Sequence, residues 1–300
     1  MLSENDEIDT DLLRSIIVRN FGEQTGGLVF QPVGEDSWSY RFGQLWVSVR
    51  RDVQGHVPTA YRAAFRLHRD GKEFVLAPLP GTDHEVVRYL AGFPVVVFPF
   101  LEAEQITPGL PLSHDERREL ERILMVLQHC PRPDGLPTED FTLPFAEQLG
   151  ESLATARRRA AGAGPFGARL TALVRTHAGH LNYLCTAQAC LAKRLRDRAP
   201  QFVLTHGDLN PANVLRTSTG LKIADWGLMK WAPPERDWYH LSRTLRFPKQ
   251  GEPDLLRYYH LRWQLSEIAE YFAVFTRPHE NDEDTQAMWR RLTRYLPESQ

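Results

Sequence analysis

The sequence contains few cysteines, no long apolar run and no marked excess of either charge. Its three cysteines, Cys130, Cys185 and Cys190, form no CxxC pair, so we predict a reduced, cytoplasmic protein without a disulfide framework. No apolar run reaches the roughly eighteen residues of a membrane span, and the acidic residues 1–7 do not resemble a signal peptide. The net charge of −2, without basic clusters interleaved with aromatic residues, indicates no nucleic-acid partner, and the lack of an apolar span indicates no membrane partner.

The remaining composition is that of an ordinary globular protein. With 300 residues, 42% hydrophobic and 25% charged, the chain can bury a large core in one two-lobed domain or two modest domains. Leucine and isoleucine recur at helical spacing over residues 9–21, which predicts a helix that covers a first sheet. Strand patterns follow at 27–33, 38–42 and 45–51 with short turns between them, which predicts an antiparallel meander rather than a βαβ unit.

Further strands and helices are expected along the rest of the chain. Apolar residues predict strands at 74–80 and 94–101, the second of them buried. Ser113 and Glu116 form a capping box that opens a helix. The later helical patterns cover residues 145–160, 167–197, 252–277 and 283–295.

One stretch, residues 202–227, carries the chemistry. An apolar run ends at His206, a polar turn holds Asp208 and Asn213, and a second apolar run ends at Asp225. This His-x-Asp-x-x-x-x-Asn spacing followed by Asp-Trp-Gly is the layout of kinase catalytic loops, in which one carboxylate accepts the proton of the attacking hydroxyl. An amide oxygen and a second carboxylate are the hard ligands that Mg²⁺ requires. The alternative is a capped hairpin turn, because Asp, Asn and Pro are ordinary turn residues.

This stretch resembles the catalytic motif of the aminoglycoside phosphotransferase and choline kinase family of small-molecule kinases, and within it the spectinomycin-type phosphotransferases. Gly207 stands where protein kinases have Arg, which is typical of the small-molecule branch. The resemblance implies an α+β, bilobal, protein-kinase-like fold. We expect a small N-lobe with an antiparallel sheet and a helix at residues 1–101, and a larger, mainly helical C-lobe at residues 102–300. The implied activity is Mg²⁺-dependent phosphorylation of a hydroxyl, with ATP or GTP as donor.

The resemblance also implies roles for residues of the catalytic loop, 204–215. Asp208 would take the proton of the acceptor hydroxyl. His206 would brace the loop rather than act as an acid or base. Asn210, where many relatives have His, would face the acceptor or the phosphate.

Two oxygen ligands are expected for the metal. Asn213 and Asp225, the first residue of the metal motif 225–227, would hold Mg²⁺ against the nucleotide phosphates. Asp237 follows a Pro-x-Glu-Arg stretch that is similar to one in spectinomycin-type kinases. We interpret it as either a helix N-cap or a brace for the catalytic loop.

The nucleotide side departs from the protein-kinase pattern. The turn at residues 34–37 takes the place of the phosphate-covering loop but lacks GxGxxG, so Ser37 would contact phosphate or the turn is an ordinary hairpin. Arg50 stands where the family has its phosphate-contacting Lys; the alternative is a surface charge on a strand. The next helix, 59–69, carries no Glu to pair with this cation. The resemblance implies that the backbone of Phe100, Leu101 and Glu102 forms the hinge that binds adenine.

The resemblance also implies that the acceptor lies between the catalytic loop and the last helices, 252–295. Four residues recur there at helical spacing as an aromatic and acidic wall: Trp263, Glu267, Glu270 and Tyr271. Such a wall would suit a cationic, polyhydroxylated small molecule. The alternative is a packed aromatic stripe with a solvated acidic edge.

The motif predicts a kinase, and the resemblance implies that it phosphorylates a hydroxyl of an aminoglycoside- or aminocyclitol-like antibiotic or a related amino sugar. A second possibility is a kinase for another small alcohol, such as choline, homoserine or a biosynthetic intermediate. A third is a pseudokinase-like protein that binds nucleotide without turnover. The altered N-lobe motifs favour this third interpretation, whereas the intact Asp208, Asn213 and Asp225 oppose it.

Overall fold

The computed structural model describes residues 4–5, 7–33, 37–50, 57–107, 109–110, 112–143, 145–159 and 164–297. The chain divides into two compact units. The first comprises Met1–Glu139 and Gln201–Gln250, and the second comprises Asp140–Pro200 and Gly251–Gln300. The predicted lobes, 1–101 and 102–300, stay a prediction.

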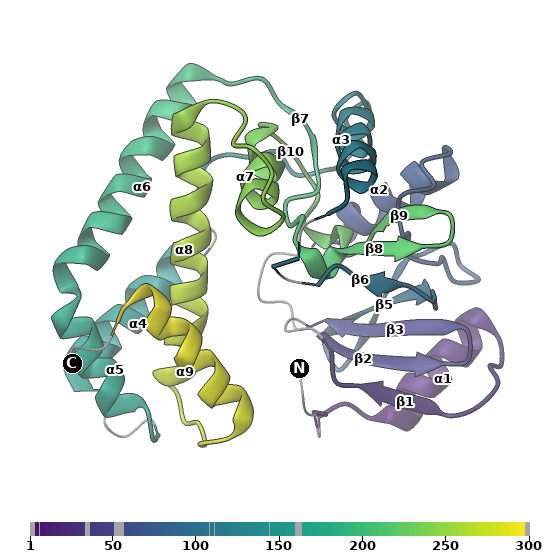
Figure 1. Ribbon diagram of the computed structural model, residues 1–300. Coiled ribbons are helices and arrows are strands. Elements are labelled where there is room, and N and C mark those ends of the chain that lie inside the picture. The colour runs from purple at the N-terminus through teal and green to yellow at the C-terminus, as the bar shows by residue number, and fades with distance from the viewer. Residues whose placement is uncertain are drawn as a thin grey trace. The chain divides into compact units, whose positions relative to one another are not determined.

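An antiparallel five-stranded sheet forms the N-terminal part of the first unit (Figure 1). Its strands are β1 (Leu28–Gln31), β2 (Ser37–Phe42), β3 (Leu45–Arg50), β4 (Val87–Leu90) and β5 (Phe93–Pro99), in the order β1-β2-β3-β5-β4. The predicted meander is therefore confirmed, while β4 was not predicted. The turn residues 34–36 lie outside the described residues.

A helix packs against each face of this sheet. On one face α1 (Thr10–Phe21) buries Leu13 and Ile17 in a core with β3 residues such as Val47. On the other face α2 (Pro58–Arg69) contributes Tyr61 to a second apolar cluster. The strand period of two places Ser48 and Arg50 on this second face, opposite Val47, as predicted from the sequence.

The rest of the first unit carries the catalytic-loop sequence. Its helices are α3 (His114–Gln128) and α7 (Glu235–Thr244). Its short strands are β6 (Glu104–Gln105), β7 (Val203–Thr205), β8 (Val214–Thr217), β9 (Gly220–Ile223) and β10 (Lys230–Ala232). Of two 3₁₀ turns, η1 (Pro211–Asn213) follows the predicted base Asp208, and η2 (Trp226–Leu228) follows Asp225, the first residue of the metal motif. β8 pairs with β6 and β9, and β7 pairs with β10.

The prediction of a strand at residues 74–80 is wrong. Among the described residues, this segment makes one isolated bridge, between Val75 and Ile223 of β9. Pro78 and Pro80 lack backbone N–H groups, so the second half of the segment cannot supply a regular ladder of hydrogen bonds. The segment instead fastens the catalytic hairpin, because Leu76 N donates to Ile223 O at 2.9 Å and Ile223 N donates to the preceding Phe74 O at 2.7 Å.

The second unit is helical. Its helices are α4 (Ala146–Arg159), α5 (Gly167–Thr176), α6 (Ala178–Arg198), α8 (Pro253–Phe275) and α9 (Glu283–Tyr295). The long helices α6 and α8 pack side by side (Figure 1). The single helix predicted at 167–197 is two helices, because the backbone of His177 leaves the helical conformation with φ −101° and ψ 16°.

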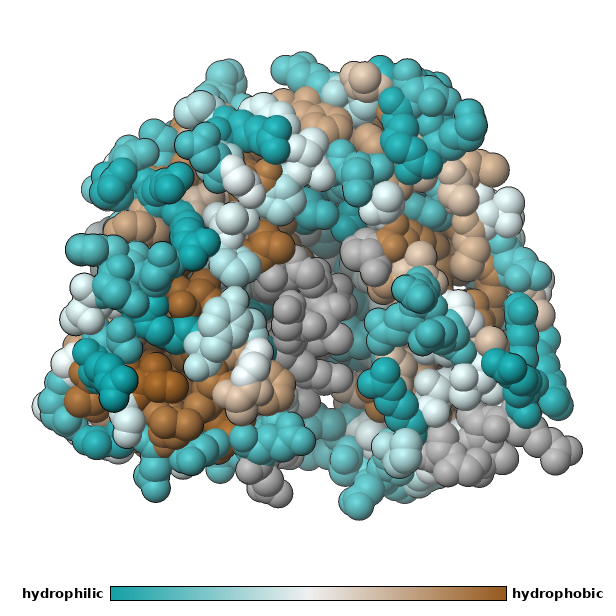
Figure 2. Space-filling model, turned by 180° about the vertical axis from the view of Figure 1, so that it is seen from behind, coloured by the Kyte–Doolittle hydropathy of each residue, from teal (hydrophilic) through white to brown (hydrophobic). Residues whose placement is uncertain are grey.

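The face shown in Figure 2 is mostly hydrophilic, with hydrophobic side chains in separate groups. In the described part of the chain, every helix is too short or too polar to cross a membrane.

Candidate active site

The catalytic loop begins where β7 ends, and its carboxylate is held by two amides. Asp208 Oδ2 accepts hydrogen bonds from Asn210 Nδ2 at 2.9 Å and Asn213 Nδ2 at 3.0 Å. Burial raises the pKa of the Asp208 carboxyl, and the nearby charge of Asp225 raises it further, while His206 and the two amides oppose these effects. The loop therefore holds a carboxylate that is a stronger base than an exposed one.

Asp237 of α7 holds the backbone of the catalytic loop in place. Its carboxylate is fully buried and accepts from His206 N at 2.9 Å and from Gly207 N at 2.7 Å. The N-cap alternative is wrong, since α7 is preceded by Pro234 as N-cap and Asp237 lies inside the helix. Two short charge-assisted bonds fix the backbone just before Asp208.

The neighbouring Arg236 explains why the loop needs glycine at position 207. Gly207 has φ +91°, and a Cβ there would lie 2.1 Å from Cζ of the buried Arg236. That guanidinium donates to Thr205 Oγ1 at 2.9 Å and to Leu228 O at 2.8 Å. Only glycine combines this backbone angle with this close approach.

His206 connects the catalytic loop to the metal motif. Asp208 N donates to Nδ1 at 3.1 Å, and Nε2 lies 2.8 Å from Ala224 O. The ring also packs edge-on against Trp226, with centroids 4.7 Å apart. Both ring nitrogens are engaged with backbone groups, which is the geometry of a brace.

The hairpin of β8 and β9 brings the two predicted metal ligands to one end. Val214 is paired with Ile223, and Ala224 N donates to Asn213 O at 2.9 Å, so Asn213 and Asp225 flank the same ladder end. Because the Asn213 amide nitrogen is turned toward Asp208, its Oδ1 is turned away, and no described residue donates to it. An amide oxygen and a carboxylate fit Mg²⁺, with further oxygens expected from the phosphates and water.

Among the described residues, no group of three His, Cys, Asp or Glu side chains is placed to hold a metal ion. A Mg²⁺ site that uses one carboxylate, one amide and the substrate's phosphates does not require such a group.

Asp225 adopts a left-handed backbone conformation, with φ 58° and ψ 62°. Its carboxylate faces Arg50 of β3, with Nη1 3.2 Å from Oδ1 and Nη2 3.4 Å from Oδ2. The Arg50 side chain is only 6% exposed, so the surface-charge alternative is wrong. Since α2 carries no Glu, Arg50 pairs instead with the carboxylate of Asp225 in the metal motif. Two guanidinium nitrogens face two carboxylate oxygens, a geometry that Lys cannot provide.

The other residues predicted to contact the nucleotide lie at the start of β2 and directly after β5. Ser37 is buried beside Ser39, with their hydroxyl oxygens 3.4 Å apart, on the face that carries Arg50. In the proposed hinge, Phe100 N already donates to Gln44 O at 2.7 Å. Any hinge contact is thus left to the Phe100 carbonyl and to the backbone of Leu101.

The predicted acceptor wall lies on α8 in the second unit. Trp263 packs edge-on against Tyr295 of α9, with centroids 5.3 Å apart, and Tyr271 is buried. The Tyr271 hydroxyl donates to Glu267 at 2.8 Å, and Glu270 is half-buried. The aromatic members contribute to packing, which favours the packed-stripe alternative for them.

Two site residues were not predicted from the sequence. Arg236 precedes Asp237 in a charged stretch and looks like a surface residue until its contacts with Gly207 are seen. His240, one helical turn after Asp237, has its Nδ1 3.7 Å from Asp208 Oδ1. The spacing of three residues from the brace was the only signal that could have indicated it.

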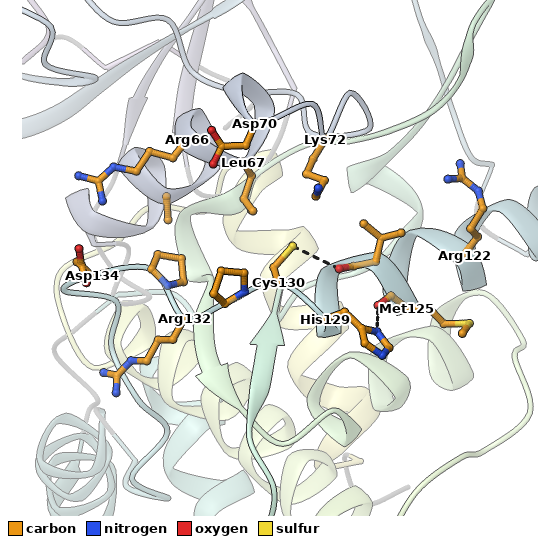
Figure 3. A pocket seen from close by; sticks show the side chains of 14 residues that line it. Arg66, Leu67, Asp70, Lys72, Arg122, Met125, His129, Cys130, Arg132 and Asp134 are labelled. Carbon is orange, nitrogen blue, oxygen red and sulfur yellow. Dashed lines mark hydrogen bonds between the residues drawn. The ribbon is translucent and has the colours of Figure 1, made fainter.

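A groove of about 670 Å³ lies elsewhere in the first unit, between α2, α3 and the segment after α3 (Figure 3). Its cations Arg66, Lys72, Arg122 and Arg132 point in different directions, and Cys130 donates to the Val126 carbonyl. No residue of the predicted site lines it. Its charged groups do not converge, so we assign it no ligand.

An antiparallel sheet with a buried cation, a loop that holds a carboxylate, and an Asn and Asp at one hairpin end together define a small-molecule kinase. Residues 48–273 match the phosphotransferase enzyme family, APH, and the chain belongs to this family. The resemblance and the fold class predicted from the sequence are confirmed.

Known relatives agree with this assignment. The chain is 44% identical to Protein StrN of Streptomyces griseus, and the alignment covers 99% of this chain and 97% of StrN. The fold is similar to that of spectinomycin phosphotransferase APH(9)-Ia, solved with ADP and spectinomycin, with a TM-score of 0.72, 16% identity and coverage of 95% and 93% of the two chains. It is also similar to choline kinase LicA from Streptococcus pneumoniae, with a TM-score of 0.52, 14% identity and coverage of 95% and 98%.

Proposed function

We propose that the protein transfers the terminal phosphoryl group of ATP to a hydroxyl of an aminoglycoside- or aminocyclitol-like antibiotic or a related amino sugar. The observation that carries the chemistry is the Asp208 carboxylate, which two amides and the Asp237 brace hold beside Asn213. Support for the substrate class comes from the spectinomycin phosphotransferase fold and from the sequence resemblance. The proposal includes a cytoplasmic location and a role in antibiotic resistance or in biosynthesis.

In the proposed reaction, the chain's residues position two substrates and move one proton. The acceptor oxygen forms a bond to the terminal phosphorus, the bond from that phosphorus to the bridging oxygen breaks, and ADP leaves. Asp208 takes the acceptor proton as the new bond forms. Arg50 contacts the phosphates, and Mg²⁺, which Asn213 and Asp225 would hold, supplies neutralisation of the phosphate charge when bound.

Several parts of the nucleotide and acceptor sites remain our proposal. Ser37 lies on the sheet face that carries Arg50 and would contact phosphate. Phe100 and Leu101 would bind the base through their backbone. On the acceptor side, the carboxylates of Glu267 and Glu270 would attract a cationic acceptor, with Trp263 and Tyr271 holding the helix surface in place.

A kinase for choline, homoserine or another small alcohol is the second candidate, because the fold is also similar to that of choline kinase LicA. The test is nucleotide consumption with Mg²⁺ against a panel of spectinomycin, kanamycin, aminocyclitols, choline and homoserine. We expect turnover with an aminocyclitol or aminoglycoside. Turnover with choline or homoserine alone would establish the second candidate, and nucleotide binding without any turnover would favour the pseudokinase-like alternative.

The Arg50–Asp225 pair leads to a prediction about nucleotide affinity. We expect Arg50→Ala to raise the KM for ATP roughly 10-fold or more, because a charge-assisted hydrogen bond contributes about 1.5–3 kcal/mol. Arg50→Lys keeps the charge but loses the fork that faces both Asp225 oxygens, so its KM should fall between those of the wild type and Arg50→Ala. Steady-state kinetics with varied ATP measures this. An unchanged KM in Arg50→Ala would reduce Arg50 to a structural partner of Asp225.

A further inference from the structure

The two carboxylate oxygens of Asp208 have different surroundings. Oδ2 accepts hydrogen bonds from Asn210 and Asn213. Oδ1 accepts none from the described residues and lies 3.7 Å from Nδ1 of His240 on α7. Oδ1 is therefore the oxygen left to take the acceptor's proton, and His240 flanks the position of the acceptor hydroxyl.

The His240 imidazole is uncharged at neutral pH. Its side chain is 13% exposed, and burial lowers its pKa to about 3, with Asp237 opposing and Arg236, Arg243 and His206 lowering it further. A neutral imidazole offers one N–H donor and one nitrogen acceptor. Neither ring nitrogen is hydrogen-bonded to any residue that the structure describes, so both remain for a ligand.

We propose that His240 binds a second hydroxyl of the acceptor, on the carbon next to the hydroxyl that Asp208 deprotonates, so that the enzyme selects vicinal diols. The inference rests on the proposed function, because it concerns the same acceptor. A gap of 3.7 Å is too long for a direct hydrogen bond between the two side chains. It suits a ligand that places one oxygen against each side chain.

The absence of charge on His240 matters for this role. A cation at this position would pair with Asp208 and weaken the base, and an anion would repel it. A neutral imidazole can bind a hydroxyl without either effect. Choline and homoserine carry no second hydroxyl beside the reacting one, so this arrangement selects against both and favours a polyhydroxylated ring.

The test compares His240→Phe, which keeps a ring but removes both nitrogens, with His240→Asn, which keeps a donor and an acceptor. The acceptor is the panel compound with the highest kcat/KM. We expect His240→Phe to raise the acceptor KM about 10-fold, the loss of one hydrogen bond, and to leave the ATP KM within error of the wild type. His240→Asn should recover most of the affinity. His180→Phe, an exposed histidine on α6, is the matched control, and thermal unfolding checks that each variant is folded.

Inhibition by two small probes isolates the second hydroxyl. trans-1,2-Cyclohexanediol and cyclohexanol differ by that one group, and each competes with the panel acceptor. The diol should inhibit the wild type several-fold more strongly than cyclohexanol, and this difference should vanish in His240→Phe. Equal inhibition of the wild type by both probes, or a preference that survives in His240→Phe, would overturn the inference while acceptor turnover leaves the proposed function standing. If no panel compound is phosphorylated, the proposed function fails and the inference fails with it.

The pH profile separates binding from proton transfer. Because the imidazole stays neutral, the pH profile of kcat should have the same acid limb in the wild type and in His240→Asn. If the acid limb of the kcat profile disappeared in His240→Asn, His240 would be the base, and its assignment as a binding residue would be overturned.

Discussion

Asp208→Asn is expected to remove turnover without destabilising the protein. A positioned general base contributes about 10²–10⁴-fold to a rate, so we expect kcat to fall by roughly 10³-fold. Burial raises the pKa of Asp208, which means that the folded protein disfavours the charged form. At neutral pH, which is above the unfolded pKa of a carboxyl, a raised folded pKa means that the ionisable group costs stability, so its replacement by an amide should leave the melting temperature unchanged or higher.

The measurement is kcat for the panel acceptor together with thermal unfolding. Asp197→Asn is the matched control, because Asp197 is an exposed α6 carboxylate whose partner is Lys193. It removes the same charge at an exposed position on a helix of the second unit and should keep wild-type kinetics. An Asp208→Asn variant with wild-type kcat would refute the assignment of the base. A variant that is inactive and also unfolded would show that the carboxylate mainly holds the loop together.

The sequence predicted the parts of this fold in which local pattern and tertiary contacts agree. The meander, the helix at 9–21 and the alternation of Val47, Ser48, Val49 and Arg50 all follow from apolar periodicity, because one sheet face packs on α1. The catalytic hairpin was predictable for a different reason. The spacing from Asp208 to Asn213 corresponds to one turn, and the spacing from Asn213 to Asp225 corresponds to the hairpin of β8 and β9.

The failures arose where a distant segment determines a local structure. Residues 74–80 have the apolar content of a strand, but with prolines at 78 and 80 the segment makes only isolated backbone hydrogen bonds, to β9 and to Val97 of β5. Arg50 was ambiguous because its partner, Asp225, lies 175 residues away in the sequence. The environment of Gly207 depends on Arg236, which no local pattern connects to it. In each case the structure depends on a contact between distant segments. Hydrophobic periodicity and residue propensity within one segment do not reveal such a contact.

The second large effect is expected at the metal motif. Asn is the suitable replacement for Asp225, because its left-handed backbone, with φ 58°, is tolerated by Asp and Asn but strained for most other side chains. Asp225→Asn keeps an oxygen in place and removes the negative charge. Metal-ion assistance supplies several kcal/mol in such reactions, so we expect kcat to fall on the order of 100-fold or more and the Mg²⁺ concentration for half-maximal activity to rise.

The dependence of activity on Mg²⁺ distinguishes this variant from Asp208→Asn. In Asp225→Asn, raising Mg²⁺ should recover part of the lost activity, whereas in Asp208→Asn extra metal cannot replace the missing base. Arg50 also bears on the result, because the mutation removes the charge that it faces at 3.2 Å and leaves the guanidinium to the nucleotide phosphates. Binding of ATP without Mg²⁺, measured by calorimetry, should therefore be as tight as in the wild type or tighter. Weaker metal-free binding together with an unchanged Mg²⁺ dependence would show that Asp225 serves to position Arg50 rather than to hold the metal.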